Sequence, residues 1–397
     1  MNNFDFFDLK KVFLFLTFYF IFIPFIFDFS FGALYAVVLA FLGVLSFYVG
    51  FSSKVKSVSF CFFDSASISS LREKIVFFTV ILFISYDSFL GLMNLFTLKT
   101  KGDYTESFEV LNDSSLYLQL LYITISTVKY FLFSLLMSKG RNYFYLIFIS
   151  QIFLFLPSST RLMALYPFIV FIVYGYYMGY VKITFLRIFL FFFISPFLFV
   201  ILLLMRGSVD NKNYFQVFEG VFNKLSLDQF LDILKVALES FQSFYYFVKI
   251  VNDDFVHLES GLVRIFFLPI SRAIWADKPE AISRIISKEY NYIQYENHGG
   301  SVATIFGDAF VNGHIVGVIV VLFILGFMSK FISFNMKCSL KLDNYNRSIF
   351  VLFYSMFLFQ FLYYFRGFFS ESIWKFFLIF LVYFFCYRVF FRLRLKF

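Results

Sequence analysis

Residues 11–29 read KVFLFLTFYFIFIPFIFDF, and residues 183–205 read ITFLRIFLFFFISPFLFVILLLM. A helix needs about 20 mostly apolar residues to cross the hydrocarbon core of a bilayer. Similar runs recur along the whole chain, in which only 15% of the residues are charged and the mean hydropathy is +0.81. The runs are continuous rather than alternating, so they predict helices. The sequence is therefore typical of an all-α polytopic membrane protein.

We expect about ten transmembrane helices in three regions of the chain. They are predicted over residues 12–27, 31–51, 75–98, 116–137, 142–157, 162–181, 183–205, 315–334, 348–365 and 374–390. Region 1–205 holds the first seven helices, a long loop follows at 206–314, and region 315–397 holds the last three helices and a tail. No small-residue cleavage site follows the first apolar run, so we expect that run to remain as a membrane anchor.

The orientation follows from the basic residues, which concentrate in alternate connections. They are Lys10, Lys11, Lys54, Lys56, Arg72, Lys74, Lys139, Arg141, Lys182, Arg187, Lys330, Lys337, Lys341, Arg347, Arg388, Arg392, Arg394 and Lys396. Cytoplasmic loops of membrane proteins carry an excess of Lys and Arg. Both termini are therefore predicted in the cytoplasm, and the loop 206–314 on the periplasmic side of a bacterial inner membrane. The same bias accounts for the net charge of +9 without a nucleic-acid partner.

The loop 206–314 is predicted to be a partly helical subdomain. One apolar stripe has helical spacing and consists of Phe230, Leu234, Leu238, Phe241, Tyr245 and Val248. Such an amphipathic helix either lies on the bilayer surface or caps the bundle. A second short helix is expected over 281–293, after the helix-breaking Pro279. Many small residues between Gly299 and Gly317 permit a tightly packed or re-entrant segment that leads into the eighth span.

Several kinds of chemistry are disfavoured by missing motifs. The chain has no glycine-rich phosphate loop, no HExxH and no CxxC, which argues against nucleotide-driven and zinc-dependent reactions. The cysteines Cys61, Cys338 and Cys386 are too far apart in sequence to suggest a metal site or a disulfide. Asp253-Asp254 is interpreted as a solvated turn, so neither a metal nor another cofactor is expected. Asp87 and Lys129, both inside predicted spans, are expected to pair with each other in the bundle.

Four arginines are predicted at or beyond span ends on the outer side: Arg161, Arg206, Arg272 and Arg366. Any one of them could be a snorkelling lipid anchor, but anchoring arginines should favour the cytoplasmic side. Guanidinium groups bind phosphate oxygens in pairs and stay charged. The set therefore predicts a diphosphate ligand, and the abundant diphosphates at this face are polyprenyl diphosphates that carry sugars. Arg206 and Arg366 each precede a glycine, which lets backbone or ligand approach closely.

A sugar transfer from such a donor needs two kinds of group. Fixed cations stabilise the departing diphosphate, and a base takes the proton of the acceptor hydroxyl. The candidate bases are Asp308 first, then His298, with His314 also nearby in sequence. Lys278 is a further cation, and Trp275 either stacks on a sugar ring or is an interfacial anchor.

Three stretches resemble a known family. The sequence PISRAIWADKP at 269–279, the sequence GGSVATIFGDAFVNGHIVG at 299–317 and the pair Arg366-Gly367 resemble the oligosaccharide repeat-unit polymerases of the O-antigen (Wzy) type. The layout of about ten spans with one long periplasmic loop is similar over the whole chain. The resemblance implies a GT-C-like membrane glycosyltransferase of lipopolysaccharide biosynthesis. It would polymerise undecaprenyl-diphosphate-linked glycans beside membrane lipids, a chain-length regulator and a flippase.

Two alternatives remain open. The O-antigen ligases have a similar layout, and their histidine motif would fall near His298–Ala303. The sequence HGGSVA found there lacks the His-Asn core of that motif, which favours a polymerase and leaves the base undecided. A non-enzymatic flippase for the same lipid-linked sugars is the alternative from another class. Such transporters commonly show internal repeats, which this sequence lacks.

Overall fold

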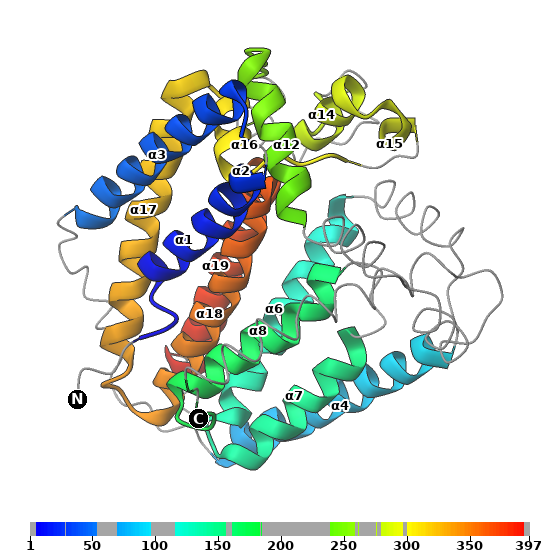
Figure 1. Ribbon diagram of the computed structural model, residues 1–397. Helices are drawn as coiled ribbons and strands as arrows, with labels where there is room; N and C mark the ends of the chain where they lie inside the picture. Colours follow the sequence, from blue (N-terminus) through cyan, green and yellow to red (C-terminus); the bar gives the residue numbers. More distant parts are fainter. Residues whose placement is uncertain are drawn as a thin grey trace.

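The computed structural model describes residues 5–27, 29–53, 70–96, 116–155, 161–182, 184, 239–258, 261, 275, 279–296 and 300–392. These residues form helices and connections, with no strand among them (Figure 1). The helices are α1 (Leu9–Thr17), η1 (Phe18–Phe22), α2 (Ile23–Phe27), α3 (Phe31–Ser52), α4 (Ser70–Phe96), α6 (Leu116–Met137), α7 (Arg141–Phe155), α8 (Arg161–Tyr177), α12 (Glu239–Asn252), α14 (Ile282–Tyr290), α15 (Tyr292–Glu296), α16 (Ile305–Val311), α17 (His314–Ser339), α18 (Asn344–Tyr363), η2 (Tyr364–Phe368) and α19 (Phe369–Arg392).

Five segments within this described part are long and apolar enough to cross a membrane. They are Leu9–Phe27, Phe31–Ser52, His314–Ser339, Asn344–Gly367 and Ser372–Val389. The predicted multi-pass, all-helical character is thus confirmed. Helices α4, α6, α7 and α8 coincide with four further predicted spans, whereas the predicted span 183–205 lies outside the described residues except Thr184. The total of ten spans stays a prediction.

Helix α18 lies at the centre of the bundle. The candidate span that contains it, Asn344–Gly367, is the most buried of the five, with 72% of its most apolar stretch buried. It packs against α17 on one side and against α6 and α8 on the other, and α4 and α7 lie beyond these (Figure 1). It contacts helices on several sides, so its buried side chains are distributed around the helix rather than along one stripe.

Connections that were predicted to be cytoplasmic meet at one end of the bundle, which we call the basic end. The Lys337 Nζ atom at the end of α17 lies 3.1 Å from Asp8 Oδ2, just before α1. At the start of α4, Glu73 lies 3.5 Å from Lys139, which follows α6, and accepts a hydrogen bond from Tyr345 of α18. Segments far apart in sequence therefore converge at this end, as the predicted orientation requires.

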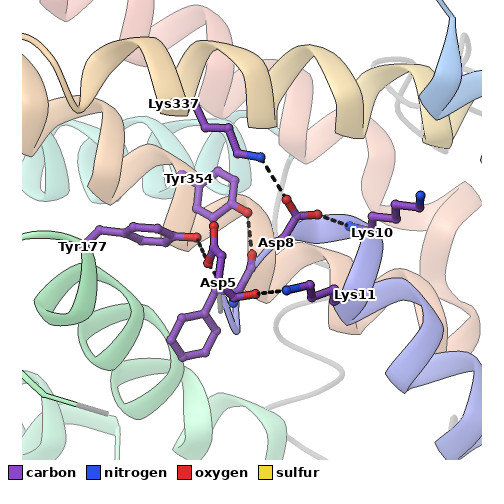
Figure 2. A network of polar contacts seen from close by, with 8 residues as sticks. Asp5, Asp8, Lys10, Lys11, Tyr177, Lys337 and Tyr354 are labelled. Carbon is purple, nitrogen blue, oxygen red and sulfur yellow. Dashed lines mark hydrogen bonds and ion pairs between the residues drawn. The ribbon is translucent and has the colours of Figure 1, made fainter. Parts of the chain in front are cut away.

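The N-terminal segment is attached to the basic end by the ion pair of Asp8 with Lys337 and by two hydrogen bonds from tyrosines, and Lys11 holds it from within (Figure 2). The Tyr177 hydroxyl donates to Asp5 Oδ1 at 2.8 Å, and the Tyr354 hydroxyl donates to the Phe7 carbonyl oxygen at 2.5 Å. The Lys11 ammonium donates to the Asp5 carbonyl oxygen at 3.1 Å. Residues 5–8 thus bridge the end of α8 and the middle of α18.

The loop helices α12, α14, α15 and α16 lie at the opposite end, which we call the loop end (Figure 1). Helix α12 caps the bundle there, in contact with α3 and α16. Its buried residues are Ser243, Phe244, Tyr246, Phe247, Val248, Ile250 and Val251. The predicted apolar stripe is therefore only partly right: Val248 is buried but Tyr245 is 47% exposed. The reason is that the run 244–251 is apolar on two adjoining faces, and the packing partners decide which face is buried.

Helices α3 and α17 run parallel and touch through their backbones. A Cβ atom at Gly50 would overlap the Phe323 carbonyl oxygen, and one at Gly326 would overlap the Phe47 carbonyl oxygen. Small residues at such contacts let two membrane helices approach closely where lipid offers no hydrophobic driving force. These two glycines explain why α17 follows α3 along its length.

Two spans contain π-helical turns. The first, η1, precedes Pro24, whose ring cannot donate a backbone hydrogen bond and clashes with the carbonyl four residues earlier. The second, η2, contains Gly367 with φ 106°, a conformation that favours glycine. Such π turns relieve a local conflict in the helix and recur at functional sites.

The expected pair of membrane charges is confirmed. Lys129 Nζ lies 3.0 Å from Asp87 Oδ2, and both side chains are nearly buried. Gln151 Nε2 donates to the same Asp87 oxygen at 2.6 Å, and the Tyr130 hydroxyl donates to Gln151 Oε1 at 3.0 Å. The network links α4, α6 and α7. Each member supplies a hydrogen-bond partner to another polar side chain, and lipid hydrocarbon supplies none.

Candidate functional site

The predicted site residues fall into three groups. The structure describes the side chains of Asp308, Arg366 and the half-buried Trp275. Arg161 is the first residue of α8, and its backbone is described. The remaining predicted residues, Arg206, Arg272, Lys278 and His298, lie outside the described residues.

The segment Ser301–Asn312 forms the centre of the loop end, and all of its residues are buried. Thr304 caps helix α16, since its hydroxyl accepts a hydrogen bond from the Gly307 amide. A Cβ atom at Gly307 would lie 3.1 Å from Phe247 of α12, so glycine lets the two helices approach. The predicted tight packing of this small-residue segment is confirmed.

Helix α14 and the start of α15 fix the entry to this segment. The Ser301 amide donates to the Ser287 hydroxyl at 2.5 Å, and the Ser301 hydroxyl donates to Gln294 Oε1 at 2.9 Å. The Gln294 amide group in turn donates to the Gly300 carbonyl oxygen at 3.0 Å. The predicted second helix is confirmed as α14, which ends at Tyr290 before α15 begins.

Asp308 has only 1% of its surface exposed. Asn312 Nδ2 donates to Asp308 Oδ1 at 2.9 Å and to the Asp308 carbonyl oxygen at 2.7 Å. Asn312 is itself held closely, because a Cβ atom at Gly261 would overlap its Oδ1 atom. Sequence reasoning missed Asn312: its spacing of one helical turn from Asp308 permits the contact but does not single it out among other possible partners.

The pair Arg366-Gly367 lies against the start of the buried segment. A Cβ atom at Gly367 would overlap the Ala303 carbonyl oxygen, and the rings of Phe365 and Phe306 lie 6.2 Å apart, edge to face. Arg366 is half-buried in η2, directly beside this contact. The predicted close approach at Gly367 is therefore an approach of backbone to backbone. Two of the motifs that support the family resemblance meet here.

Arg161 begins α8, and Arg366 lies in η2, which directly continues α18, the antiparallel neighbour of α8. The hydroxyls of Tyr174 in α8 and Ser348 in α18 lie 2.6 Å apart, and the rings of Tyr166 and Phe359 lie 4.7 Å apart. From the second contact, Arg161 is about 7.5 Å and Arg366 about 10 Å further along the helix axes, at 1.5 Å per residue. The backbones of both arginines therefore lie at similar levels of the loop end.

The acidic turn after α12 is a surface feature. Asp253 and Asp254 are exposed, which confirms the interpretation as a solvated turn. Asp254 Oδ1 lies 2.8 Å from His314 Nε2 at the start of α17. The Tyr290 hydroxyl donates to Asp253 Oδ2, and burial together with this hydrogen bond raises the pKa of Tyr290. Among the described residues no cluster of three or more metal-binding side chains occurs.

No protein-family model, no curated protein and no solved structure matches the chain. At the loop end, Arg366 immediately precedes Gly367, whose backbone contacts Ala303 in the small-residue segment that contains the buried Asp308. A cation for a leaving anion and a carboxylate for a proton are the groups that transfer from a diphosphate donor requires.

Proposed function

We propose that the protein is a glycosyltransferase that polymerises undecaprenyl-diphosphate-linked oligosaccharide repeat units. In this proposal it is a GT-C-like protein of about ten spans in a bacterial inner membrane, with both termini in the cytoplasm and the loop end in the periplasm. The observation that supports it most is the contact of Gly367 with Ala303. This contact brings together two separate motifs that resemble the O-antigen polymerases.

The arginines hold the donor in this proposal. Arg366 and Arg161 stand at similar levels of the loop end, and we assign them, with Arg206 and Arg272, to the diphosphate of the growing chain. A guanidinium keeps its charge at any relevant pH and binds two phosphate oxygens at once. Its charge stabilises the negative charge that develops as the diphosphate leaves.

The carboxylate accepts the proton. A hydroxyl oxygen of the incoming repeat unit attacks the anomeric carbon of the growing chain and forms the new glycosidic bond. The bond from that carbon to the diphosphate breaks, and its electron pair leaves with undecaprenyl diphosphate. The hydroxyl proton passes to Asp308, whose orientation Asn312 fixes, with His298 as the second choice. Trp275 and Lys278 are assigned to the sugars and their phosphates.

The test is a reconstituted reaction. Purified full-length protein is incubated with a synthetic undecaprenyl-diphosphate-linked repeat unit, without nucleotide, and the products are separated on a gel. We expect a ladder of polymers from the unaltered protein. Asp308→Asn keeps the shape of the side chain but cannot accept the proton, so we expect a rate loss of about 100-fold or more.

Arg366→Lys tests the donor site. Lysine keeps the charge but not the planar fork, so polymers should shorten toward a single repeat. Lys341→Gln, an exposed substitution at the basic end, is the charge-removing control and should give normal ladders. A ladder of normal length from Arg366→Lys would remove Arg366 from the site. A single unextended repeat from the unaltered protein would contradict the proposal as a whole.

The ligase alternative is separated by its product in cells. Loss of a polymerase leaves glycans one repeat long on the surface, whereas loss of a ligase leaves long glycans on their lipid carrier. Loss of a flippase instead leaves single repeat units on the cytoplasmic face. A deletion strain followed by extraction of carrier-linked glycans therefore distinguishes the three functions.

A further inference from the structure

An apolar groove lies between α17, α18 and α19, in the half of the bundle near the basic end. Helix α18 forms its floor and the other two helices form its walls. The groove measures about 800 Å³ including its open side, and its lining includes Ile332, Met336, Ile349, Phe353, Phe380 and Phe384. All six of these side chains are hydrocarbon or thioether.

The polar groups in the walls are already engaged by neighbouring helix atoms. The Tyr383 hydroxyl donates to the Ile349 carbonyl oxygen at 2.9 Å, and the Tyr387 hydroxyl donates to Asn346 Oδ1 at 3.1 Å. Asn335 Nδ2 donates to a carbonyl oxygen of its own helix at 2.8 Å. The occupant that fits such a lining has no need of hydrogen bonds, which points to a hydrocarbon chain.

One charged side chain stands at the end of the groove. Arg388 is exposed, and its guanidinium lies 5.0 Å from the ring centre of Phe384. Along α19 the lining extends from Phe380 to Arg388, about 12 Å at 1.5 Å per residue. Leu381 and Phe385 beside it are 60% and 66% exposed, as expected for a helix face that meets lipid. An apolar slot that ends in a cation matches an acyl chain followed by a phosphate.

We propose that this groove binds one acyl chain of an anionic membrane phospholipid, with the lipid phosphate on Arg388. The lipid-linked sugar donor is the wrong occupant, because its diphosphate is assigned to the loop end, whereas Arg388 lies near the basic end. The headgroup of a phospholipid in this groove would lie in the leaflet at the basic end, opposite the leaflet of the sugar donor's diphosphate. The exclusion of the sugar donor rests on the proposed function, whereas the fit of an acyl chain to the lining and of a phosphate to Arg388 does not.

The first test fills the groove. Full-length protein is stripped of lipid in detergent, titrated with phosphatidylglycerol and examined by native mass spectrometry. We expect one phosphatidylglycerol to bind to the unaltered protein, and Ile332→Phe to weaken this binding at least about tenfold, because the added ring occupies the slot. The matched control is Ile324→Phe on the same helix, where Ile324 is 46% exposed to the outside. It should bind as the unaltered protein does.

The second test separates the headgroup from the chain. A charged hydrogen bond to phosphate contributes enough that Arg388→Gln should weaken phosphatidylglycerol binding about ten- to hundredfold. The same variant should bind uncharged diacylglycerol as the unaltered protein does. Arg388 is exposed, so this variant remains informative if Ile332→Phe does not fold. Equal phosphatidylglycerol affinity in Arg388→Gln, or recovery of a polyprenyl phosphate from the groove, overturns the proposal.

Discussion

Position 367 imposes two requirements that only glycine meets. Its φ of 106° is a conformation that L side chains rarely adopt, and a Cβ atom there would overlap the Ala303 carbonyl oxygen. We expect Gly367→Ala to lower the free energy of unfolding by about 1–3 kcal/mol from backbone strain alone, with the overlap adding to this loss. Thermal unfolding in detergent measures it. Gly140→Ala, whose Cβ would meet open space, is the control and should change stability by less than about 0.5 kcal/mol.

Asp87 and Lys129 should behave as a unit. Asp87→Leu leaves the Lys129 ammonium nearly buried without its carboxylate, which we expect to cost about 3–5 kcal/mol of stability. Replacing both residues by apolar ones, Asp87→Leu with Lys129→Met, should recover most of that loss. A double-mutant cycle by thermal unfolding measures the coupling. Additive losses would show that the ion pair contributes nothing of its own.

The pairing of Asp87 with Lys129 was predictable because a charge in hydrocarbon needs a partner, and the predicted spans offered few. The contact of Gly367 with Ala303 was not predictable, because local sequence does not say which helices pack together. The role of Asn312 was missed for a different reason. An amide side chain next to apolar residues has many possible partners, and only the burial of Asp308 singles out this one. Arg206, Arg272, Lys278 and His298 remain predictions.

At the scale of helices, the parallel pair α3 and α17 depends on two glycines. Gly326→Leu would drive a branched side chain into the backbone of Phe47. Overpacking a close contact costs about 1–3 kcal/mol, and more where backbone must move, so we expect a loss in or above that range. Thermal unfolding measures it. Val320→Leu, on a lipid-exposed position of the same helix, should be nearly neutral, and equal losses in both variants would contradict the close packing.

Helix α12 shows the limit of periodicity as a guide. A helical spacing of apolar residues predicted a helix that either lies on the bilayer surface or caps the bundle, and the described half forms a helix that caps the bundle. The predicted buried face was only partly right, because aromatic residues such as Tyr245 satisfy an apolar pattern yet tolerate water at their hydroxyl. The contacts with α3 and α16 select the face, and those contacts are long-range.

At the scale of the whole molecule, the orientation can be tested with thiols. Cys338 is exposed at the basic end, and Tyr292 is 62% exposed at the loop end. One variant keeps Cys338 as its single cysteine, and another has Tyr292→Cys as its single cysteine. In spheroplasts a membrane-impermeant maleimide should label the second at once and the first only after permeabilisation. The reverse pattern would invert the predicted topology and place the candidate site in the cytoplasm.

The distribution of Lys and Arg predicted more of the global arrangement than any motif. Segments as distant as Asp8 and Lys337, or Glu73 and Lys139, meet at the end where the charge pattern had placed them together. The charge pattern predicts this because the excess of Lys and Arg in short cytoplasmic loops sets the orientation of each span, whatever the packing of the helices. The packing order around α18, by contrast, depends on the shapes of many apolar side chains, which composition does not encode.

The attachment of residues 5–8 has a consequence for biogenesis. Asp8 contacts Lys337, and Phe7 contacts Tyr354, so Asp8 acquires its partner only after α17 has been synthesised, and Phe7 only after half of α18 has followed. At about 5–20 residues per second, the early helices wait on the order of tens of seconds in the bilayer with these acidic groups hydrated. Truncated chains that stop before α18 therefore cannot form the contact of Phe7 with Tyr354, and we expect quality-control proteases to remove them faster than the longer chain.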